Sequence, residues 1–211
     1  DAFFSSVSYG YRVADSLGIK FIPVDVRRKT VPISGTRMRQ DPLLNWDHLH
    51  PVVRAHFVKR VAIVGPTGSG KSKLAAELAQ YFKTVSVASY MQNMIQDYAE
   101  NIPDFTTDKL SLDDVSTIAR GQIASEDAIA PQANKVMFCD TELETVARWS
   151  QQKFNTCPEW VKTAAQERKY DLYLLTADCD WWKSTLEREG KAYHIVDCLD
   201  RAISTVYAAI P

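Results

Sequence analysis

Residues 65–72 read Gly-Pro-Thr-Gly-Ser-Gly-Lys-Ser and match the phosphate-binding pattern G-x-x-x-x-G-K-[ST]. The segment before them, residues 60–64, is a short β-branched apolar run of the kind that forms a buried parallel strand. The segment after them places Leu74, Leu78 and Phe82 along one side of a helix. A strand, a glycine-rich loop and a helix in this order predict an α/β fold built around a P-loop.

The chemistry of phosphate binding explains these residue types. Glycines let successive backbone N–H groups turn inward and form an anion-binding nest at the positive end of a helix. Lys71 adds a point charge for the β- and γ-phosphates, and the hydroxyl of Ser72 is a ligand for Mg²⁺. A glycine-rich turn that matches by chance is the alternative, but the flanking strand and helix argue against it. We therefore predict that the chain binds ATP and Mg²⁺. The predicted nucleotide contacts are Gly65, Thr67, Gly68, Ser69, Gly70, Lys71 and Ser72.

The composition is that of an ordinary globular protein. Of 211 residues, 45% are hydrophobic and 24% are charged. The formal net charge of −1 argues against a general nucleic-acid binder, which usually carries a basic excess. The sequence holds no run of about eighteen apolar residues that would span a membrane, and it opens with no secretion leader. We expect a cytoplasmic protein with no membrane or nucleic-acid partner.

Cysteines and histidines do not predict a zinc site. No two of the four cysteines form a C-x-x-C pair, so we expect reduced thiols rather than metal ligands or disulfides. Three histidines lie between residues 48 and 56, but a structural zinc site would need four spaced ligands. The cysteines are Cys139, Cys157, Cys179 and Cys198.

A second informative stretch is the apolar segment 135–140, which ends in the carboxylate of Asp140. P-loop enzymes use a carboxylate at such a strand end to hold Mg²⁺. We predict that Asp140 and Ser72 place the metal, and that Lys71 and Asp140 are the catalytic residues. Asp140 could instead accept the proton of an acceptor hydroxyl. The sequence does not separate these two roles.

Strand-like and helical segments alternate from residue 60 onward. This alternation predicts a parallel sheet of about five strands with helices on both faces. The ligand should lie at the carboxyl ends of the strands, beside the P-loop. The helix predicted over residues 112–130 is expected to be broken at Gly121. The strands are predicted at residues 60–64, 85–88, 135–140, 170–175 and 192–196.

The first fifty residues predict part of another α/β unit. A helix over residues 9–17 and a strand over 19–24 follow one another, and no strand is predicted before the helix. Beyond them, Ser34 and Thr36 are natural N-cap residues close to Arg39. Such a helix start would bind an anion, although a capped helix with solvated arginines fits equally well.

Several motifs occur in an order that is fairly specific. The run 31–39, then Asp41-Pro42 and Trp46, and then the P-loop resemble the bacterial NadR-type bifunctional proteins. These proteins join a nicotinamide-nucleotide adenylyltransferase domain to a ribosylnicotinamide kinase domain. The resemblance covers nearly the whole chain. Further matches lie at residues 118–122, 138–142, 149–150, 157–160 and 170–175.

The resemblance implies a division into three parts. Residues 1–50 would be the C-terminal remnant of a Rossmann-like nucleotidyltransferase domain, 51–59 a linker, and 60–211 a P-loop kinase-like domain. In the first part Ser34, Thr36 and Arg39 match the family motif I-S-[SG]-T-x-x-R, which contacts ATP phosphates. The histidine-bearing motif G-x-F-D-P-x-H-x-G-H is absent, so adenylate transfer is not expected from this chain alone.

For the kinase part, the resemblance implies transfer of the γ-phosphate of ATP to the ribose 5′-hydroxyl of ribosylnicotinamide. The product would be nicotinamide mononucleotide, made in NAD salvage. Tyr90 is the implied substrate contact. The oligomeric state is not predicted. The tryptophans at 149, 160, 181 and 182 are expected to be core residues rather than substrate contacts.

Three departures from the family pattern leave other functions open. Residues 66–68 replace the middle of the family's loop, and of the family's E-Y-x-R only Tyr90 is present. After the strand at 170–175, the family's P-W-x-x-D-x-x-R and its arginine-bearing lid helix are missing or shortened. The alternatives are a nucleotide-binding module with little or no turnover and a P-loop kinase or NTPase for another substrate.

Overall fold

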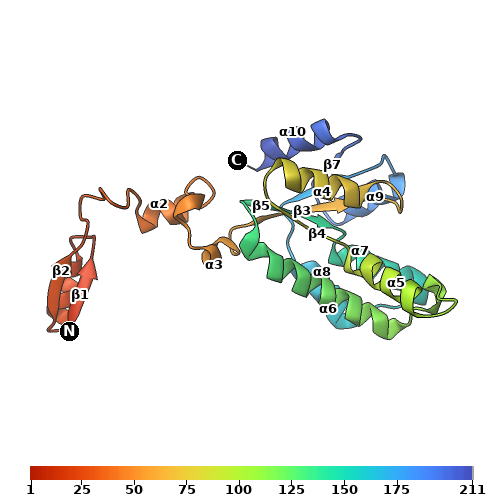
Figure 1. Ribbon diagram of the computed structural model, residues 1–211, viewed down its shortest axis with the longest axis horizontal. Coiled ribbons are helices and arrows are strands. Elements are labelled where there is room, and N and C mark those ends of the chain that lie inside the picture. The colour runs from red at the N-terminus through yellow and green to blue at the C-terminus, as the bar shows by residue number, and fades with distance from the viewer. Residues whose placement is uncertain (211) are drawn as a thin grey trace. The chain divides into compact units, whose positions relative to one another are not determined.

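The computed structural model describes residues 1–210, which divide into two compact units, Asp1–Leu49 and the part from His50 onward. The residues of the first unit are red to orange in Figure 1, and those of the second run from orange to blue. Residues 51–59, expected to be a linker, belong to the second unit and begin with helix α3 (Pro51–Arg54). In the described part of the chain, no helix combines the length and the apolar character that crossing a membrane requires.

The first unit contains a β-α-β motif. Strand β1 (Ala2–Ser5) pairs in parallel with β2 (Lys20–Pro23), and helix α1 (Gly10–Ser16) connects them. A Cβ at Gly10 would lie 2.7 Å from Cε2 of Phe21, so only glycine allows α1 to approach β2 this closely. The prediction that no strand precedes the helix was wrong, because the short run Ala2–Ser5 does form one. Helix α2 (Gly35–Gln40) and the 3-10 helix η1 (Trp46–His48) follow.

The second unit contains the predicted five-stranded parallel sheet, in the order β4-β5-β3-β6-β7. The central strands β3, β5 and β6 are apolar along nearly their whole length because helices cover both of their faces. The strand order reverses at β3, which places the P-loop at the switch point where ligands bind in such sheets. The strands are β3 (Lys59–Val64), β4 (Val85–Val87), β5 (Val136–Asp140), β6 (Leu172–Leu175) and β7 (Tyr193–Ile195).

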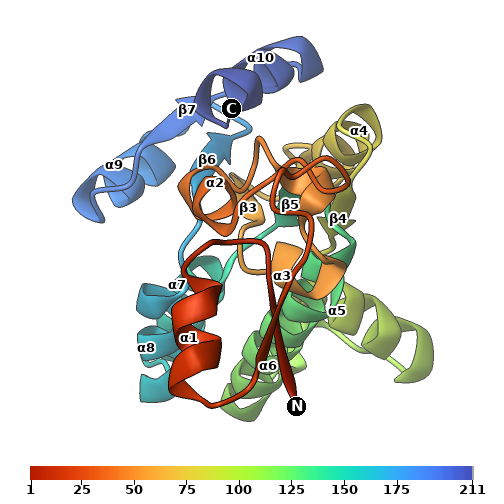
Figure 2. The ribbon, with the colours of Figure 1, turned by 90° about the vertical axis from the view of Figure 1, so that its left-hand side faces the viewer.

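Helices flank this sheet on both faces, as predicted. Figures 1 and 2 show α4 and α10 on one face and α5 to α8 on the other. Two 3-10 helices, η2 (Thr107–Lys109) and η3 (Ala130–Gln132), flank α6. The helices are α4 (Lys71–Tyr81), α5 (Tyr90–Asn101), α6 (Leu112–Ile129), α7 (Leu143–Phe154), α8 (Glu159–Glu167), α9 (Asp180–Arg188) and α10 (Leu199–Ala209).

The structure corrects the predicted break in α6, which runs through Gly121 without interruption. A Cβ at this position would lie 2.3 Å from Cζ of Tyr90, so the glycine makes room for a ring on α5. Glycine is unfavourable in a helix interior, but here a tertiary contact outweighs that local preference.

Helix α9 follows β6 after residues 176–179, and no lid helix lies between them. Its buried residues Trp182 and Leu186 pack against side chains of β3 and β6. Helix α9 is therefore part of the packed core of the second unit rather than a free flap.

Candidate active site

The P-loop lies between β3 and α4, and its backbone requires glycine at three positions. Gly65, Gly68 and Gly70 have φ angles of 146°, 79° and 83°, which L-residues with a Cβ rarely adopt. Gly70 is also the N-cap of α4, so the helix begins at the residue after the loop. A Cβ at Gly65 would lie 2.4 Å from Oγ1 of Thr176.

Lys71 lies across the mouth of this loop. Its Nζ donates to the carbonyl oxygens of Gly65, at 3.1 Å, and of Pro66, at 2.8 Å. Burial lowers the pKa of Lys71, and the negative charge of Asp140 partly opposes that shift. The ammonium group of Lys71 is thus held against the loop. The backbone N–H groups of an anion nest point to the same place, so both kinds of donor could bind the same phosphate group.

Ser72 and Asp140 meet beside Lys71. The Ser72 hydroxyl donates to Oδ2 of Asp140 at 2.5 Å, while Oδ1 of Asp140 is buried and has no hydrogen-bond partner. Asp140 is only 2% exposed, and this burial raises its pKa, against the opposing effects of the Ser72 hydrogen bond and Lys71. A hydroxyl beside a carboxylate with one uncommitted buried oxygen fits Mg²⁺, which proteins usually bind with one or two carboxylates plus substrate phosphates.

Thr176, which the sequence did not single out, supports the loop from the end of β6. Its hydroxyl lies 2.6 Å from that of Ser69, and its backbone N–H donates to the carbonyl of Val64 at 3.0 Å. The Ser69 hydroxyl also donates to the carbonyl of Pro66 at 2.8 Å. A small polar residue directly after a buried strand was the signal that could have identified Thr176.

Two cavities adjoin different parts of the P-loop. The first has a volume of about 210 Å³ and is bounded by the loop and by α5, α7 and α9. The second, of about 240 Å³, adjoins the start of α4 and the turn between β7 and α10. The first is lined by Gly65, Pro66, Thr67, Lys71, Ser89, Met91, Gln92, Thr141, Thr145, Arg148, Trp149, Gln152, Trp181 and Trp182. The second includes Ser69, Gly70, Lys73, Thr176, Asp197 and Cys198.

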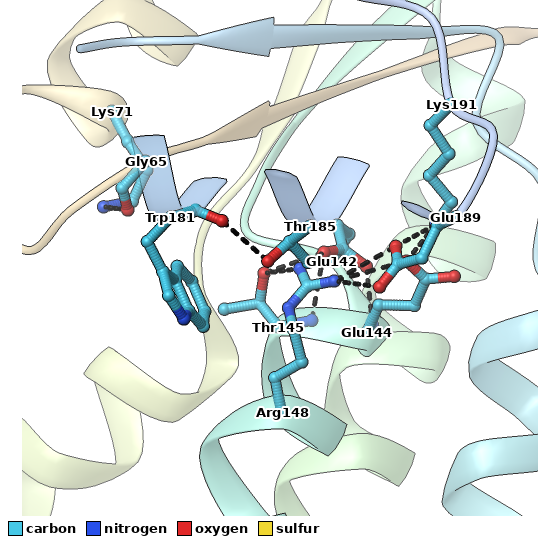
Figure 3. Close-up of polar contacts among 10 residues, drawn as sticks. All are labelled: Gly65, Lys71, Glu142, Glu144, Thr145, Arg148, Trp181, Thr185, Glu189 and Lys191. Carbon is cyan, nitrogen blue, oxygen red and sulfur yellow. Dashed lines mark hydrogen bonds and ion pairs between the residues drawn. The ribbon is translucent and has the colours of Figure 1, made fainter. Parts of the chain in front are cut away.

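A cluster of charged side chains lies beside the first cavity, and Arg148 of this cluster lines it (Figure 3). Arg148 of α7 donates to Glu142 at 2.9 Å and to Glu189 at 2.9 Å. Its guanidinium carbon lies 4.8 Å from the ring centre of Trp182, a cation–π distance. Glu142 also caps α7 by accepting the backbone N–H of Thr145 at 3.0 Å. Arg148 therefore joins the start of α7 to α9 while lining the cavity.

Glu144 and Lys191 extend this cluster (Figure 3). Lys191 forms ion pairs with Glu144 and Glu189. Burial, together with the neighbouring carboxyl groups of Glu189 and Glu142, raises the pKa of Glu144 to about 7, although Lys191 acts in the opposite direction. One carboxyl of the cluster therefore titrates near neutral pH.

The structure gathers some of the predicted site residues and separates others. The predicted P-loop residues and Asp140 lie together. The ring of Tyr90 lies against Gly121, whereas its neighbours Met91 and Gln92 line the first cavity. Trp149, Trp181 and Trp182, expected to be core residues, also line that cavity, although Trp182 is buried in the core as well.

The other predicted phosphate contacts lie in the first unit. Ser34 caps α2 by accepting the backbone N–H of Arg37 at 3.1 Å, and Thr36 and Arg39 are on the same helix. The sequence allowed either an anion-binding helix start or an ordinary capped helix at this position, and the Ser34 contact is that of a capped helix.

Comparison with known proteins finds a matching family model and several similar proteins. A family model described as AAA domain matches residues 60–210. The trifunctional NAD biosynthesis/regulator proteins NadR of Escherichia coli (strain K12) and Salmonella typhimurium are each 30% identical over 170 residues. Each match covers 80% of this chain, which spans 40% of the length of these relatives.

Two solved structures share the fold. A crystal structure of NadR protein in complex with NR has a TM-score of 0.78 at 18% identity and covers 99% of this chain and 67% of that one. A NadR complex with NAD and AMP-PNP has the same TM-score and identity and covers 99% of this chain and 66% of that one.

Proposed function

The chain belongs to the AAA domain family, and we propose that its second unit is an ATP-dependent kinase that phosphorylates ribosylnicotinamide. The observation that carries the proposal is that Lys71 lines the first cavity from the P-loop, while the Ser72 hydroxyl is hydrogen-bonded to Asp140 next to it. The curated NadR relatives act in NAD biosynthesis, and NadR structures hold NR or AMP-PNP, which supports this choice of donor and acceptor. The product would be nicotinamide mononucleotide.

The P-loop would hold the β- and γ-phosphates through its backbone N–H groups and through Lys71. Ser72 and Asp140 would hold Mg²⁺, which supplies positive charge to the phosphoryl oxygens. Lys71 now donates to two loop carbonyls, and phosphate oxygens would replace these acceptors. The adenine side of the nucleotide is assigned to the second cavity, beside the turn between β7 and α10.

The first cavity would receive the acceptor. In the transfer, the ribose hydroxyl oxygen forms a bond to the γ-phosphorus, and the bond from that phosphorus to the bridging oxygen of ADP breaks. The hydroxyl proton passes to a phosphate oxygen, to solvent or to the carboxylate of Asp140. Thr145, Arg148 and Trp181 line the cavity and would position the acceptor so that its hydroxyl faces Lys71 and the P-loop.

We assign residues 1–50 to a remnant of a nucleotidyltransferase domain. The parallel β1-α1-β2 motif and the N-capped α2 support this assignment. Adenylate transfer is not part of the proposal, because the family's histidine-bearing motif is absent from the sequence.

One observation favours a second candidate, a nucleotide-binding module with little turnover. The short connection at residues 176–179 leads directly into the packed helix α9, so no lid helix brings arginines over the phosphates. A lid normally excludes water and adds charge that stabilises the transition state.

ADP release separates the two candidates. The protein is incubated with ATP, Mg²⁺ and ribosylnicotinamide, beside a blank without acceptor and a Lys71→Ala variant. The kinase predicts acceptor-dependent ADP and nicotinamide mononucleotide, both lost in the variant. Tight ATP binding without acceptor-dependent ADP would leave the binding module. ADP release that is indifferent to the acceptor would indicate an NTPase with another substrate.

A further inference from the structure

Gln122 of α6 is a buried amide that makes a bond to another helix. It is 1% exposed, and its Oε1 accepts the backbone N–H of Tyr90 at 3.0 Å. Tyr90 is the first residue of α5, and the first N–H groups of a helix have no partner within the helix. Gln122 therefore satisfies from α6 a donor that α5 itself leaves open.

Glu126 fixes which way this amide points. The Nε2 of Gln122 donates to Oε1 of Glu126 at 3.2 Å. An ionised carboxylate only accepts hydrogen bonds, so the NH₂ group of Gln122 must face Glu126 and its oxygen must face Tyr90.

Glu126 is itself held in place by the segment between α8 and β6 and by β3. It is fully buried and accepts from Nε of Arg168 at 2.7 Å and from the hydroxyl of Tyr170 at 2.9 Å. Nε of Arg60, on β3, lies 3.8 Å from the same carboxylate. A buried carboxylate with these partners has little freedom to reorient, so it anchors Gln122 rigidly.

The same turn of α6 also contacts the side chain of Tyr90. The ring carbons of Tyr90 lie so close to Gly121 that a Cβ there would be 2.3–2.4 Å away. Gly121 and Gln122 thus hold the start of α5 through a ring contact and a backbone hydrogen bond. Neither residue lines the acceptor cavity, whereas Ser89, Met91 and Gln92, which flank Tyr90, do.

We propose that Gln122 is a positioning residue that places the first turn of α5 against the acceptor. The role rests on the proposed kinase function. Glu126 orients the Gln122 amide, and that amide fixes the backbone N–H of Tyr90. The position of Tyr90 in turn sets the positions of Met91 and Gln92, which line the cavity. The sequence predicted that Tyr90 contacts the substrate. In this proposal its chief role is instead to attach α5 to α6 through its backbone N–H and its ring.

The first test replaces the amide and follows the backbone directly. Gln122→Met keeps the length of the side chain and removes both hydrogen bonds. We expect amide hydrogen exchange at Tyr90 and Met91 to become at least tenfold faster, while exchange in the middle of α4 is unchanged. Gln96→Met is the matched control, because Gln96 is exposed on α5, the helix that Gln122 contacts, and its side chain donates to Glu100 in the next turn. Unchanged exchange at Tyr90 would overturn the proposal.

The second test is kinetic. We expect Gln122→Met to raise the KM for ribosylnicotinamide about tenfold while the KM for ATP stays within twofold. Gly121→Ala disturbs the same turn through the Tyr90 ring and should give the same pattern if the Gln122 variant does not fold. Faster exchange at Tyr90 with an unchanged acceptor KM would overturn the positioning role. Equal changes for both substrates would do so too, because they would indicate a general structural defect.

Different results would refute the kinase function and the positioning role of Gln122. A wild-type protein without acceptor-dependent ADP release would refute the kinase function, and the exchange experiment would still test the link between α6 and α5. A wild-type protein with that activity and a Gln122→Met variant with normal kinetics would refute only the positioning role.

Discussion

The Ser72 hydroxyl donates a 2.5 Å hydrogen bond to Asp140, linking the first turn of α4 to the last residue of β5. The bond uses one carboxylate oxygen and leaves the other buried without a partner. The P-loop and the neighbouring strand end are thereby tied together at the point where the proposed kinase would hold Mg²⁺.

This pair predicts how three substitutions behave. Asp140→Asn removes the charge and Ser72→Ala the hydroxyl, and each should lower kcat about 100-fold, the usual effect of deleting one electrostatic group in a transition state. Ser72→Thr retains a hydroxyl and should stay within a few-fold of wild type. Initial rates measured across a Mg²⁺ titration check both expectations.

The same titration separates the two roles left open for Asp140. A metal ligand predicts that Asp140→Asn raises the Mg²⁺ concentration needed for half-maximal rate. If that concentration were unchanged while the rate fell and lost its dependence on pH, Asp140 would be the proton acceptor instead.

Much of this site could be predicted because its signals are local. The strand, loop and helix around Lys71 are contiguous in sequence. Asp140 could be found because parallel strands end at one edge of a sheet. Arg148 and Trp181 could not be found in this way, since their place in the cavity depends on how α7 and α9 pack. Gly121 could not be interpreted from the sequence for the same reason. The low helix propensity of glycine predicted a break in α6, but the glycine is there to make space for the ring of Tyr90.

Gly65 tests the geometry of the loop. Gly65→Ala places a Cβ 2.4 Å from Oγ1 of Thr176 and forces a side chain onto a φ of 146°. We expect ATP affinity to fall at least tenfold, because the loop must shift away from its phosphate-binding shape. Calorimetric titration with ATP measures the loss. The double variant Gly65→Ala/Thr176→Ala should recover only part of it, because the backbone strain persists. Full recovery would show that the contact with Thr176 is the whole cause.

Glu144 predicts a dependence of stability on pH. Its pKa is raised from the ordinary 4.5 to about 7 in the fold. Between these values the folded chain holds a proton that the unfolded chain has released, so stability falls as the pH rises from about 4.5 to 7. Glu189 has a lowered pKa, so its contribution changes only below this window.

Glu144→Gln removes this titration. The difference in Tm, variant minus wild type, should therefore be more positive at pH 8 than at pH 5, since only the wild type pays to ionise the buried carboxyl. Thermal unfolding at both pH values measures it. Glu167→Gln, at an exposed position on α8, is the control and should show no such trend. A difference that becomes more negative at pH 8 would mean that the ion pair with Lys191 outweighs burial.

Trp181 and Trp182 are neighbours on α9 with opposite expected effects. Trp182 is 6% exposed and packs against β3 and β6, so Trp182→Ala should cost about 3–5 kcal/mol of folding free energy. Trp181 is 46% exposed and lines the acceptor cavity, and its ring contacts that of Trp182 edge to face with the ring centres 5.2 Å apart, so Trp181→Ala should cost only about 1 kcal/mol. If its indole stacks on the pyridine ring of the acceptor, losing about 1 kcal/mol of aromatic contact raises the acceptor KM roughly fivefold. Denaturant unfolding and steady-state kinetics on both variants separate the roles. An unchanged acceptor KM in Trp181→Ala would show that the acceptor ring lies elsewhere in the cavity.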